Sequence, residues 1–367
     1  TPIKSSAASD VYKRQFKDSA PAELVDCVGH DDLMVLMFTS GTTGRSKAVM
    51  LSERNFFTTV ECQVKFGDAM LDYKHEHMPE DKNDVLSNFA ILPLFHLGTF
   101  ICLFVWACKG WALNLSADIR DFYRDLGLMH SDAIAVAPML MEAIYKDVKR
   151  GRRARLNGIW NPCGSSAMFD GAMLAELAQQ GMMITQVYGM TETCGDGIIN
   201  YEQDEKHIRA VGKPDDHAEY KLDETGEICI RGGCVMLGYY KDPEATAEVL
   251  DADGWFHTGD LARVDEDGFY YITGRKKNII ILDNGENVSP EELENLLSKC
   301  EAVKECIVRE KGKKICAVIY CGEADQQTVR DFITETNRTL PLYKRMSAVE
   351  FSTEPLPRTG TGKLLRK

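Results

Sequence analysis

Short apolar runs alternate with longer amphipathic stretches along most of this chain, and this alternation limits the fold more than any other feature. From about Asp31 to Leu250, strand-like runs such as LMVLMF and AIAVAP are followed by segments with helical periodicity. Apolar runs of strand length that alternate with helix-length segments predict a sheet covered by helices. The sequence therefore predicts a large α/β domain with layered sheets.

The pattern changes between about Ala210 and Tyr271, where short strand-like runs are separated by Gly, Asp-Gly and Asp-Pro. Such punctuation is typical of antiparallel strands joined by tight turns. After Arg275 come a strand, a polar turn, a helix, two more strand runs and a further helix. Ser289 is expected to cap the first of these helices, with Glu292 three residues later as in a capping box. We expect a small antiparallel β region and then a small α+β C-terminal domain.

The predicted domain boundary lies near residues 275–278. The chain has 367 residues and a hydrophobic fraction of 44%, which is enough for more than one domain. We assign residues 21–275 to the large domain and 276–367 to the small one. Residues 1–20 are set apart as a non-native or disordered leader, because Ser5 to Gln15 has no periodic apolar face.

Charge and cysteine usage exclude some classes of function. The formal net charge of −13 argues against nucleic acid as a partner and allows at most peripheral membrane contact. Val85 to Cys108 carries no charged side chain, but Pro93, His96 and Gly98 interrupt it, which favours a core strand and a packed helix over a membrane span. The cysteines form no CxxC pair and no Cys/His cluster at zinc-ligand spacing, so we expect a reducing, cytoplasmic location.

A loop rich in glycine and hydroxyl side chains directly follows the strand-like run LMVLMF. Glycines let backbone amides approach a triphosphate, hydroxyls donate hydrogen bonds, and a lysine adds positive charge. The spacing differs from that of a Walker A loop, because no hydroxyl residue follows the lysine. Seen alone, the stretch could equally be a surface turn. The loop reads Thr39, Ser40, Gly41, Thr42, Thr43, Gly44, Arg45, Ser46, Lys47.

A second motif, from Tyr188 to Thr193, follows another strand-like run. It combines the aromatic ring of Tyr188, the hydroxyl of Thr191 and the carboxylate of Glu192 within a few positions. A bound nucleotide needs a ring to stack on its base, a donor to its α-phosphate and a hard oxygen ligand for its Mg²⁺. The motif therefore predicts a nucleotide–magnesium site.

Two further motifs add charged groups. Asp260, in Thr258-Gly259-Asp260, can accept both ribose hydroxyls, and Arg275 can bind ribose or phosphate oxygens. Near the C-terminus, Lys363 stands in a Gly/Thr frame that could deliver one ammonium to developing negative charge. Each of these residues taken singly is as well explained by a turn, a salt bridge or a solvated lysine.

In this order, the motifs closely resemble those of the adenylate-forming superfamily of acyl-CoA synthetases, peptide-synthetase adenylation domains and luciferases. The resemblance extends from about Asp31 to Lys367. It implies that ATP activates a carboxylic acid to an acyl-adenylate, that pyrophosphate leaves, and that the acyl group passes to coenzyme A. Ala48 and Glu53 depart from residues common in the family, but they lie beyond the predicted phosphate contacts. Members carry a further stretch before the loop, so we expect the chain to be an N-terminally truncated fragment.

The resemblance also implies roles for single residues. The Thr39–Lys47 loop holds the ATP phosphates, while Thr191 and Glu192 serve the α-phosphate and the magnesium ion. Asp260 and Arg275 bind the ribose, and Lys363 acts in the adenylation step. The adenine site is implied to comprise Gly164, Ser165, Ser166, Tyr188 and Gly189.

The second half-reaction is implied to need a rotation of the small domain, which makes that domain mobile. Lys277 matches the hinge position of the family, and Gly285 matches a loop that lines the pantetheine tunnel. His96 resembles a residue at the mouth of the acyl pocket, although a core histidine with satisfied hydrogen bonds explains it nearly as well.

The acid is assigned from weaker similarities. The stretch from Asn284 to Glu292 and the words Pro357-Arg358-Thr359 look most like fatty acyl-CoA ligases, so we expect a medium- or long-chain fatty acid. Aryl or bile-type acids come next. Two alternatives stay open: a domain that loads the phosphopantetheine of an acyl carrier protein, and a nucleotide-binding fragment without turnover.

Overall fold

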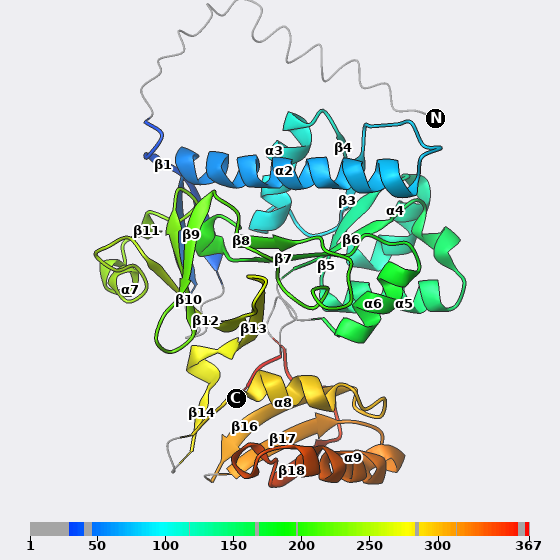
Figure 1. The fold of residues 1–367 in the computed structure, drawn as a ribbon, viewed down its shortest axis with the longest axis vertical. Helices are drawn as coiled ribbons and strands as arrows, with labels where there is room; N and C mark the ends of the chain where they lie inside the picture. The colour runs from blue at the N-terminus through cyan, green and yellow to red at the C-terminus, as the bar shows by residue number, and fades with distance from the viewer. Residues whose placement is uncertain are drawn as a thin grey trace, which may run out of the picture.

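The computed structural model describes residues 29–39, 46–116, 118–165, 169–195, 197–282, 286–312, 314–358 and 364–366. Figure 1 shows a large upper body and a smaller C-terminal part, which follow one another through β13 (Tyr270–Arg275) and β14 (Ile280–Ile281). The predicted architecture, a large α/β body followed by a small α+β part, is confirmed.

A six-stranded sheet forms the centre of the body, in the order β4-β3-β5-β6-β7-β8. Its strands pair in parallel except β8, which runs antiparallel to β7. Parallel strands need helical crossovers, which explains the predicted alternation of strand and helix. The strands are β3 (Ser87–Ala90), β4 (Ala112–Leu115), β5 (Ala133–Val136), β6 (Asn161–Ser165), β7 (Thr185–Gly189) and β8 (Gly197–Asn200).

Helices cover this sheet. The long helix α2 (Glu53–His77) runs across the body in Figure 1, and Ser52 caps it in a reciprocal pair of hydrogen bonds with Asn55. Such a box satisfies two backbone groups that a helix start leaves unpaired. The other helices of the body are α3 (Leu97–Cys108), α4 (Phe122–Leu128), α5 (Pro138–Lys149), α6 (Gly171–Gln179) and α7 (Pro243–Ala247).

The uncharged stretch Val85 to Cys108 folds as β3 followed by α3, as expected. Phe89 and Ile101 are fully buried within it. In the described part of the chain, no helix combines the length and the hydropathy that crossing a bilayer requires.

Two smaller sheets complete the body. β1 (Leu33–Thr39), β2 (Lys47–Ser52) and β11 (Gly238–Tyr239) form an antiparallel sheet in which β2 is central. The predicted antiparallel region is a four-stranded sheet in the order β13-β12-β10-β9. Its remaining strands are β9 (Ala218–Leu222), β10 (Glu227–Gly232) and β12 (Phe256–Val264).

The C-terminal part has a hydrophobic core of its own, which includes Ile280, Leu293, Ile319 and Ile333. This separate core supports the boundary that we propose near residues 275–278. Its elements are β15 (Asn287–Val288), which pairs with β14, α8 (Pro290–Leu297), β16 (Glu305–Lys311), β17 (Lys314–Tyr320), α9 (Gln326–Thr339) and β18 (Ala348–Ser352).

Helix α8 begins as the sequence predicts, with one difference. The Ser289 side chain accepts a hydrogen bond from the Glu292 backbone N–H, as an N-cap should. The Glu292 carboxylate, however, binds Lys344 at 2.7 and 2.9 Å instead of closing a capping box. A charged partner from the segment after α9 thus replaces the local backbone donor.

Candidate active site

The glycine-rich loop closes a β-hairpin, and its two ends are held together. Thr39 at the end of β1 is the register partner of Lys47 at the start of β2. β2 also pairs with β11, where Val49 stands opposite Tyr239. The base of the loop therefore lies beside residues nearly two hundred positions later in the chain.

Lys47, Tyr239 and Glu192 form one chain of contacts, which we call the Glu192 cluster. The Lys47 ammonium lies 4.4 Å from the centre of the Tyr239 ring. The Tyr239 hydroxyl donates a 2.9 Å hydrogen bond to Oε1 of Glu192. A cation over an aromatic face is stabilised by about 0.5–1 kcal/mol, or more when water is excluded. This arrangement fixes the loop lysine near the carboxylate of the second motif.

Glu192 is fixed by its backbone as well. It lies in the short 3-10 turn Thr191–Thr193 that follows β7, and its carbonyl accepts a 2.9 Å bond from the backbone N–H of Met236. Burial raises the pKa of the Tyr239 phenol, and the nearby Glu192 charge raises it further. The phenol therefore stays protonated and acts as the donor.

Tyr188, Asp260 and Arg275 form a second group, the Asp260 cluster. Asp260 on β12 and Arg275 on β13 are register partners, and the Arg275 Nε lies 2.7 Å from Oδ1 of Asp260. The Tyr188 hydroxyl donates a 3.2 Å bond to Oδ2 of the same carboxylate. Both carboxylate oxygens thus have a donor, which is what a buried charge requires.

Burial of Asp260 and Tyr188 affects the protonation of this cluster. Asp260 is 4% exposed and Tyr188 is 9% exposed. Burial raises the pKa of the Tyr188 phenol well above its usual range, and the Asp260 charge adds to this. Next to Asp260, the backbone at Gly259 has a φ of 72°, a left-handed conformation that favours glycine.

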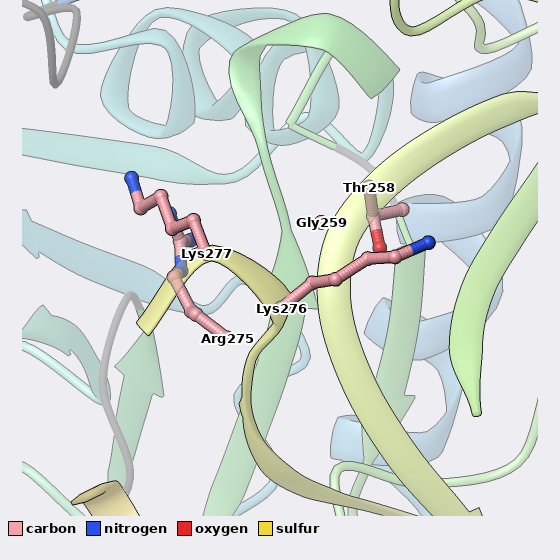
Figure 2. A pocket seen from close by; sticks show the side chains of 5 residues that line it. All are labelled: Thr258, Gly259, Arg275, Lys276 and Lys277. Carbon is pink, nitrogen blue, oxygen red and sulfur yellow. The ribbon is translucent and has the colours of Figure 1, made fainter. Parts of the chain in front are cut away.

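A pocket of about 330 Å³ opens beside the Asp260 cluster. Figure 2 shows Lys276 extending toward Thr258 and Lys277 extending to the opposite side, with Arg275 next to Lys277. Since three consecutive basic residues line this pocket, it suits an anionic ligand. The pocket brings together Arg275, predicted to bind the ribose, and Lys277, predicted at the hinge.

Two predicted residues lie elsewhere. Gly164 is buried on β6, where an added Cβ would clash with the Phe169 ring, so this packing needs glycine. His96 is exposed at the N-cap position of α3, so the core-histidine interpretation is wrong. Its role at an acyl pocket stays a prediction.

Several predicted residues fall outside the described parts of the chain, and their roles stay predictions. The backbone of Ser165 is described within β6, but its side chain is not. The residues outside are Ser40, Gly41, Thr42, Thr43, Gly44, Ser166, Gly285 and Lys363.

Three further residues of the site, Tyr239, Glu227 and Lys276, lie outside the sequence motifs. Glu227 is 3% exposed, accepts a 2.7 Å bond from the Gly259 N–H and binds Lys276 at 2.7 Å. No local pattern marks these residues, because their partners lie on other strands. The one sequence signal for Lys276 is its position between Arg275 and Lys277.

Comparison with known proteins matches two families. Residues 3–240 match the family described as AMP-binding enzyme, and residues 292–363 match the AMP-binding enzyme C-terminal domain.

Curated relatives include enzymes that act on different acids. The chain is 31% identical to a feruloyl-CoA synthase of Amycolatopsis sp over 95% of its own length and 71% of the relative. It is 30% identical to the long-chain-fatty-acid–CoA ligase of Salmonella typhimurium, over 92% of this chain and 61% of the relative. It is 29% identical to 4-coumarate–CoA ligase 3 of Oryza sativa, over 96% of this chain and 67% of the relative.

A similar solved structure is the O-succinylbenzoate coenzyme A synthetase of Bacillus subtilis in complex with ATP and magnesium ion. The TM-score is 0.75 at 25% identity, with 95% of this chain and 72% of that chain covered. The same synthetase in complex with its acyl-adenylate intermediate matches with the same score and identity. The chain thus spans between 61% and 72% of the length of these relatives.

Proposed function

Because the chain belongs to the AMP-binding enzyme family, we propose that it carries out ATP-dependent activation of a carboxylic acid and transfer of the acyl group to coenzyme A. The main support for the proposal is that residues from different predicted motifs contact one another. The loop end at Lys47 meets Glu192 through Tyr239. Tyr188, which begins the Glu192 motif, bonds to Asp260, and Asp260 pairs with Arg275. A set of unrelated surface turns would not be connected in this way.

In the first half-reaction the substrate carboxylate attacks the α-phosphorus of ATP and pyrophosphate leaves. Both reactants are anions, so the protein accelerates the step by positioning them and by neutralising charge. Lys47 and the loop amides bind the phosphates, Thr191 donates to the α-phosphate, and Asp260 with Arg275 orients the ribose. Lys363 then neutralises charge that develops at the reacting centre.

Glu192 fits the predicted magnesium site. Its carboxylate is a hard oxygen ligand, and among the described residues Tyr239 donates to one of its two oxygens, Oε1. When bound, Mg²⁺ supplies positive charge that offsets the charge of the phosphates. Glu192 holds the ion, and Tyr239 orients Glu192.

We propose a medium- or long-chain fatty acid as the substrate. The fatty acid ligase of Salmonella typhimurium supports this choice, as do the sequence stretches around Asn287 and Arg358. An aryl acid is the second candidate, because the feruloyl and coumarate enzymes match at 31% and 29% identity, close to the 30% of the fatty acid ligase. Loading of an acyl carrier protein in place of coenzyme A remains the alternative for the second half-reaction.

Pyrophosphate exchange and release, measured across fatty and aryl acids, test the proposal directly. Adenylation predicts exchange that depends on both ATP and one class of acid. A nucleotide-binding protein without turnover would give no exchange with any acid, and this would overturn the proposal. Comparing free coenzyme A with a carrier protein as acceptor then separates the two second steps.

Replacing Lys363 by alanine tests the division of labour between the half-reactions. Loss of one preorganised donor typically costs about 10²- to 10³-fold in rate. We expect adenylation to fall by this factor, while thioester formation from supplied acyl-adenylate is retained. Lys367→Ala is the matched control from the same tail. Equal loss of both half-reactions would contradict the role of Lys363.

Gly285→Leu tests the proposed path of the thiol. A leucine side chain in a loop that the pantetheine arm must pass should block thioester formation and leave adenylation intact. Retained transfer to coenzyme A would refute this placement.

A further inference from the structure

A thiol, an imidazole and carboxylates converge on one face of the four-stranded sheet, next to the pocket but apart from the Glu192 cluster. Cys229 on β10 and His257 on β12 are register partners in antiparallel strands. The Cys229 Sγ lies 3.5 Å from the His257 Nδ1. Residues directly opposite each other project to the same face of a sheet, so the pairing itself brings the two groups together.

Two carboxylates complete the group. Glu227 stands two positions before Cys229 and therefore on the same face of β10, and its Oε2 lies 3.5 Å from the His257 Nδ1. Asp223 lies in the turn before β10. Ligand atoms of Asp223, Cys229 and His257 all lie within 4.8 Å of one another.

The distances match those of a tetrahedral zinc site. Zinc bonds of about 2.3 Å to sulfur and about 2.0–2.2 Å to nitrogen or oxygen place two tetrahedral ligands roughly 3.5 Å apart. The two distances from the His257 Nδ1, to Cys229 and to Glu227, are both 3.5 Å. The His257–Cys229 and His257–Glu227 pairs therefore have the spacing that one zinc ion imposes on its ligands.

The second ring nitrogen of His257, Nε2, also has a partner. It lies 3.5 Å from the Asp251 carboxylate. Metal-binding histidines almost always direct their second ring nitrogen to a carboxylate or carbonyl group, which fixes the tautomer. Asp251 thus favours a proton on Nε2 and a free lone pair on Nδ1, the nitrogen that faces Cys229 and Glu227.

The charge of the cluster favours a divalent cation. Three carboxylates, Asp223, Glu227 and Asp251, surround His257. Two cations face them: Lys276, 2.7 Å from Glu227 and 3.5 Å from Asp223, and Lys221, the register partner of Cys229 on β9. Burial raises the pKa of the Cys229 thiol to about 11, and the Glu227 and Asp223 charges contribute. The thiol is therefore neutral at pH 7 unless a metal ion takes the place of its proton.

We propose that Asp223, Glu227, Cys229 and His257 form a binding site for a zinc-type divalent cation, for which Lys276 competes. On binding, the Cys229 S–H bond breaks, the thiolate sulfur bonds to the metal, and the proton passes to solvent. Neutral His257 donates the Nδ1 lone pair, and the carboxylates donate oxygen lone pairs. The Lys276 ammonium is displaced from Glu227.

The site has an entry path and a neighbour that it can influence. The His257 side chain is one third exposed, so an ion can enter from solvent. Lys276 lines the pocket together with Arg275 and Lys277, as Figure 2 shows. Metal binding therefore adds an unpaired ammonium to a pocket that already suits anions.

Titration of the whole, tag-free chain with Co²⁺ tests the proposal without any enzyme assay. Tetrahedral Co²⁺ bound by a thiolate gives an intense charge-transfer absorption that carboxylate sites lack. We expect one equivalent of Co²⁺ to produce it, Zn²⁺ to remove it, and the pH to fall in weakly buffered solution. Affinity rises with pH, because the thiol must lose its proton.

Variants locate the site. Cys229→Ser should abolish the charge-transfer band, and His257→Gln should weaken Co²⁺ binding at least tenfold. Lys276→Met, which removes the competing cation, should tighten it by roughly tenfold. Cys62→Ser is the control, because Cys62 belongs to another Cys/Asp/His group, with Asp215 and His217. A band that survives Cys229→Ser, or that Cys62→Ser abolishes, would overturn the proposal, as would the absence of any band.

Discussion

The Glu192 and Asp260 clusters are joined by residues 188–192, yet they treat their carboxylates differently. Asp260 receives both a guanidinium and a phenol, so its charge is neutralised within the cluster. Glu192 receives a phenol, and no ion pair to it exists among the described residues; Lys47 meets the Tyr239 ring instead. A neutralised carboxylate can orient a neutral ligand, whereas one without a cation has capacity for an incoming metal ion. The difference separates a positioning group from a charge-bearing group.

The largest effect should follow Glu192→Gln. Glutamine keeps an oxygen that accepts from Tyr239 but loses the charge that holds Mg²⁺. We expect pyrophosphate exchange to fall by about 10²- to 10³-fold, and excess Mg²⁺ to restore part of it. Glu301→Gln, an exposed change after α8 in the C-terminal part, is the control. Normal exchange at low Mg²⁺ would remove Glu192 from the metal site.

Asp260→Asn should affect both stability and nucleotide affinity. Breaking a fully buried ion pair costs about 3–5 kcal/mol, but the Arg275 side chain is 45% exposed and can regain water. We expect a loss of about 2 kcal/mol in the free energy of unfolding, measured in urea, and a raised KM for ATP. A raised KM without any change in kcat would fit a positioning role. A lowered kcat at saturating ATP would argue for a role in the chemical step.

Asp223, a carboxylate with both hydrogen-bond donors and a cation as partners, contributes to the pH dependence of stability in acid. Burial alone would raise the pKa of Asp223, but hydrogen bonds from Thr225 and the Glu227 N–H, with the Lys276 charge, outweigh it and hold the pKa at about 2. A depressed folded-state pKa gives stability that is present above the unfolded value of 3.8 and is lost as the pH falls toward 2.

Asp223→Asn should therefore remove an acid-dependent part of the stability. Between pH 5 and pH 3 the wild type should lose about 1 kcal/mol more of its free energy of unfolding than the variant, from a total of about 2 kcal/mol. Urea unfolding at both pH values, without divalent metal, measures this. Asp72→Asn on the exposed side of α2 gives the background. Parallel losses in wild type and Asp223→Asn would contradict the expectation.

The smallest effects should come from a matched pair of phenylalanine variants. Tyr188→Phe and Tyr239→Phe each remove one hydroxyl that donates to a carboxylate. A hydrogen bond to a charged group contributes about 1.5–3 kcal/mol, and Asp260 keeps Arg275 in the first variant, so we expect about 1 kcal/mol of lost stability there. Tyr239→Phe should instead raise the Mg²⁺ requirement several-fold, as pyrophosphate exchange would show. Identical phenotypes would erase the distinction between the two clusters.

Much of the fold was predictable, because it depends on local periodicity and punctuation. The strand before the glycine-rich loop, the division of 85–108 into a strand and a helix, and the Ser289 cap are all as expected. The predicted capping box at Glu292 is replaced by an ion pair with Lys344, which comes from a distant segment. Local patterns report local energies, and a long-range ion pair can override them.

The site was predictable in its conspicuous residues only. Hydroxyl, glycine and charged residues in short motifs point to nucleotide chemistry, and some of the described ones, such as Tyr188, Asp260 and Arg275, are in contact. The sequence does not mark Tyr239 as a site residue, because a tyrosine in a strand is ordinarily a packing residue. Its orientation between Lys47 and Glu192 exists only once β11 pairs with β2.

The sequence by itself determined the layered α/β architecture, the separate C-terminal part and the family. These follow from residue types at short spacing, which act through backbone conformation and motif chemistry. Only the tertiary structure decided which charges are neutralised, and that Cys229 faces His257 beside Glu227. Neither cysteine nor histidine stands at a zinc-ligand spacing in the sequence. Strand register brings them together, and register is fixed by the pairing of the whole sheet rather than by any single segment.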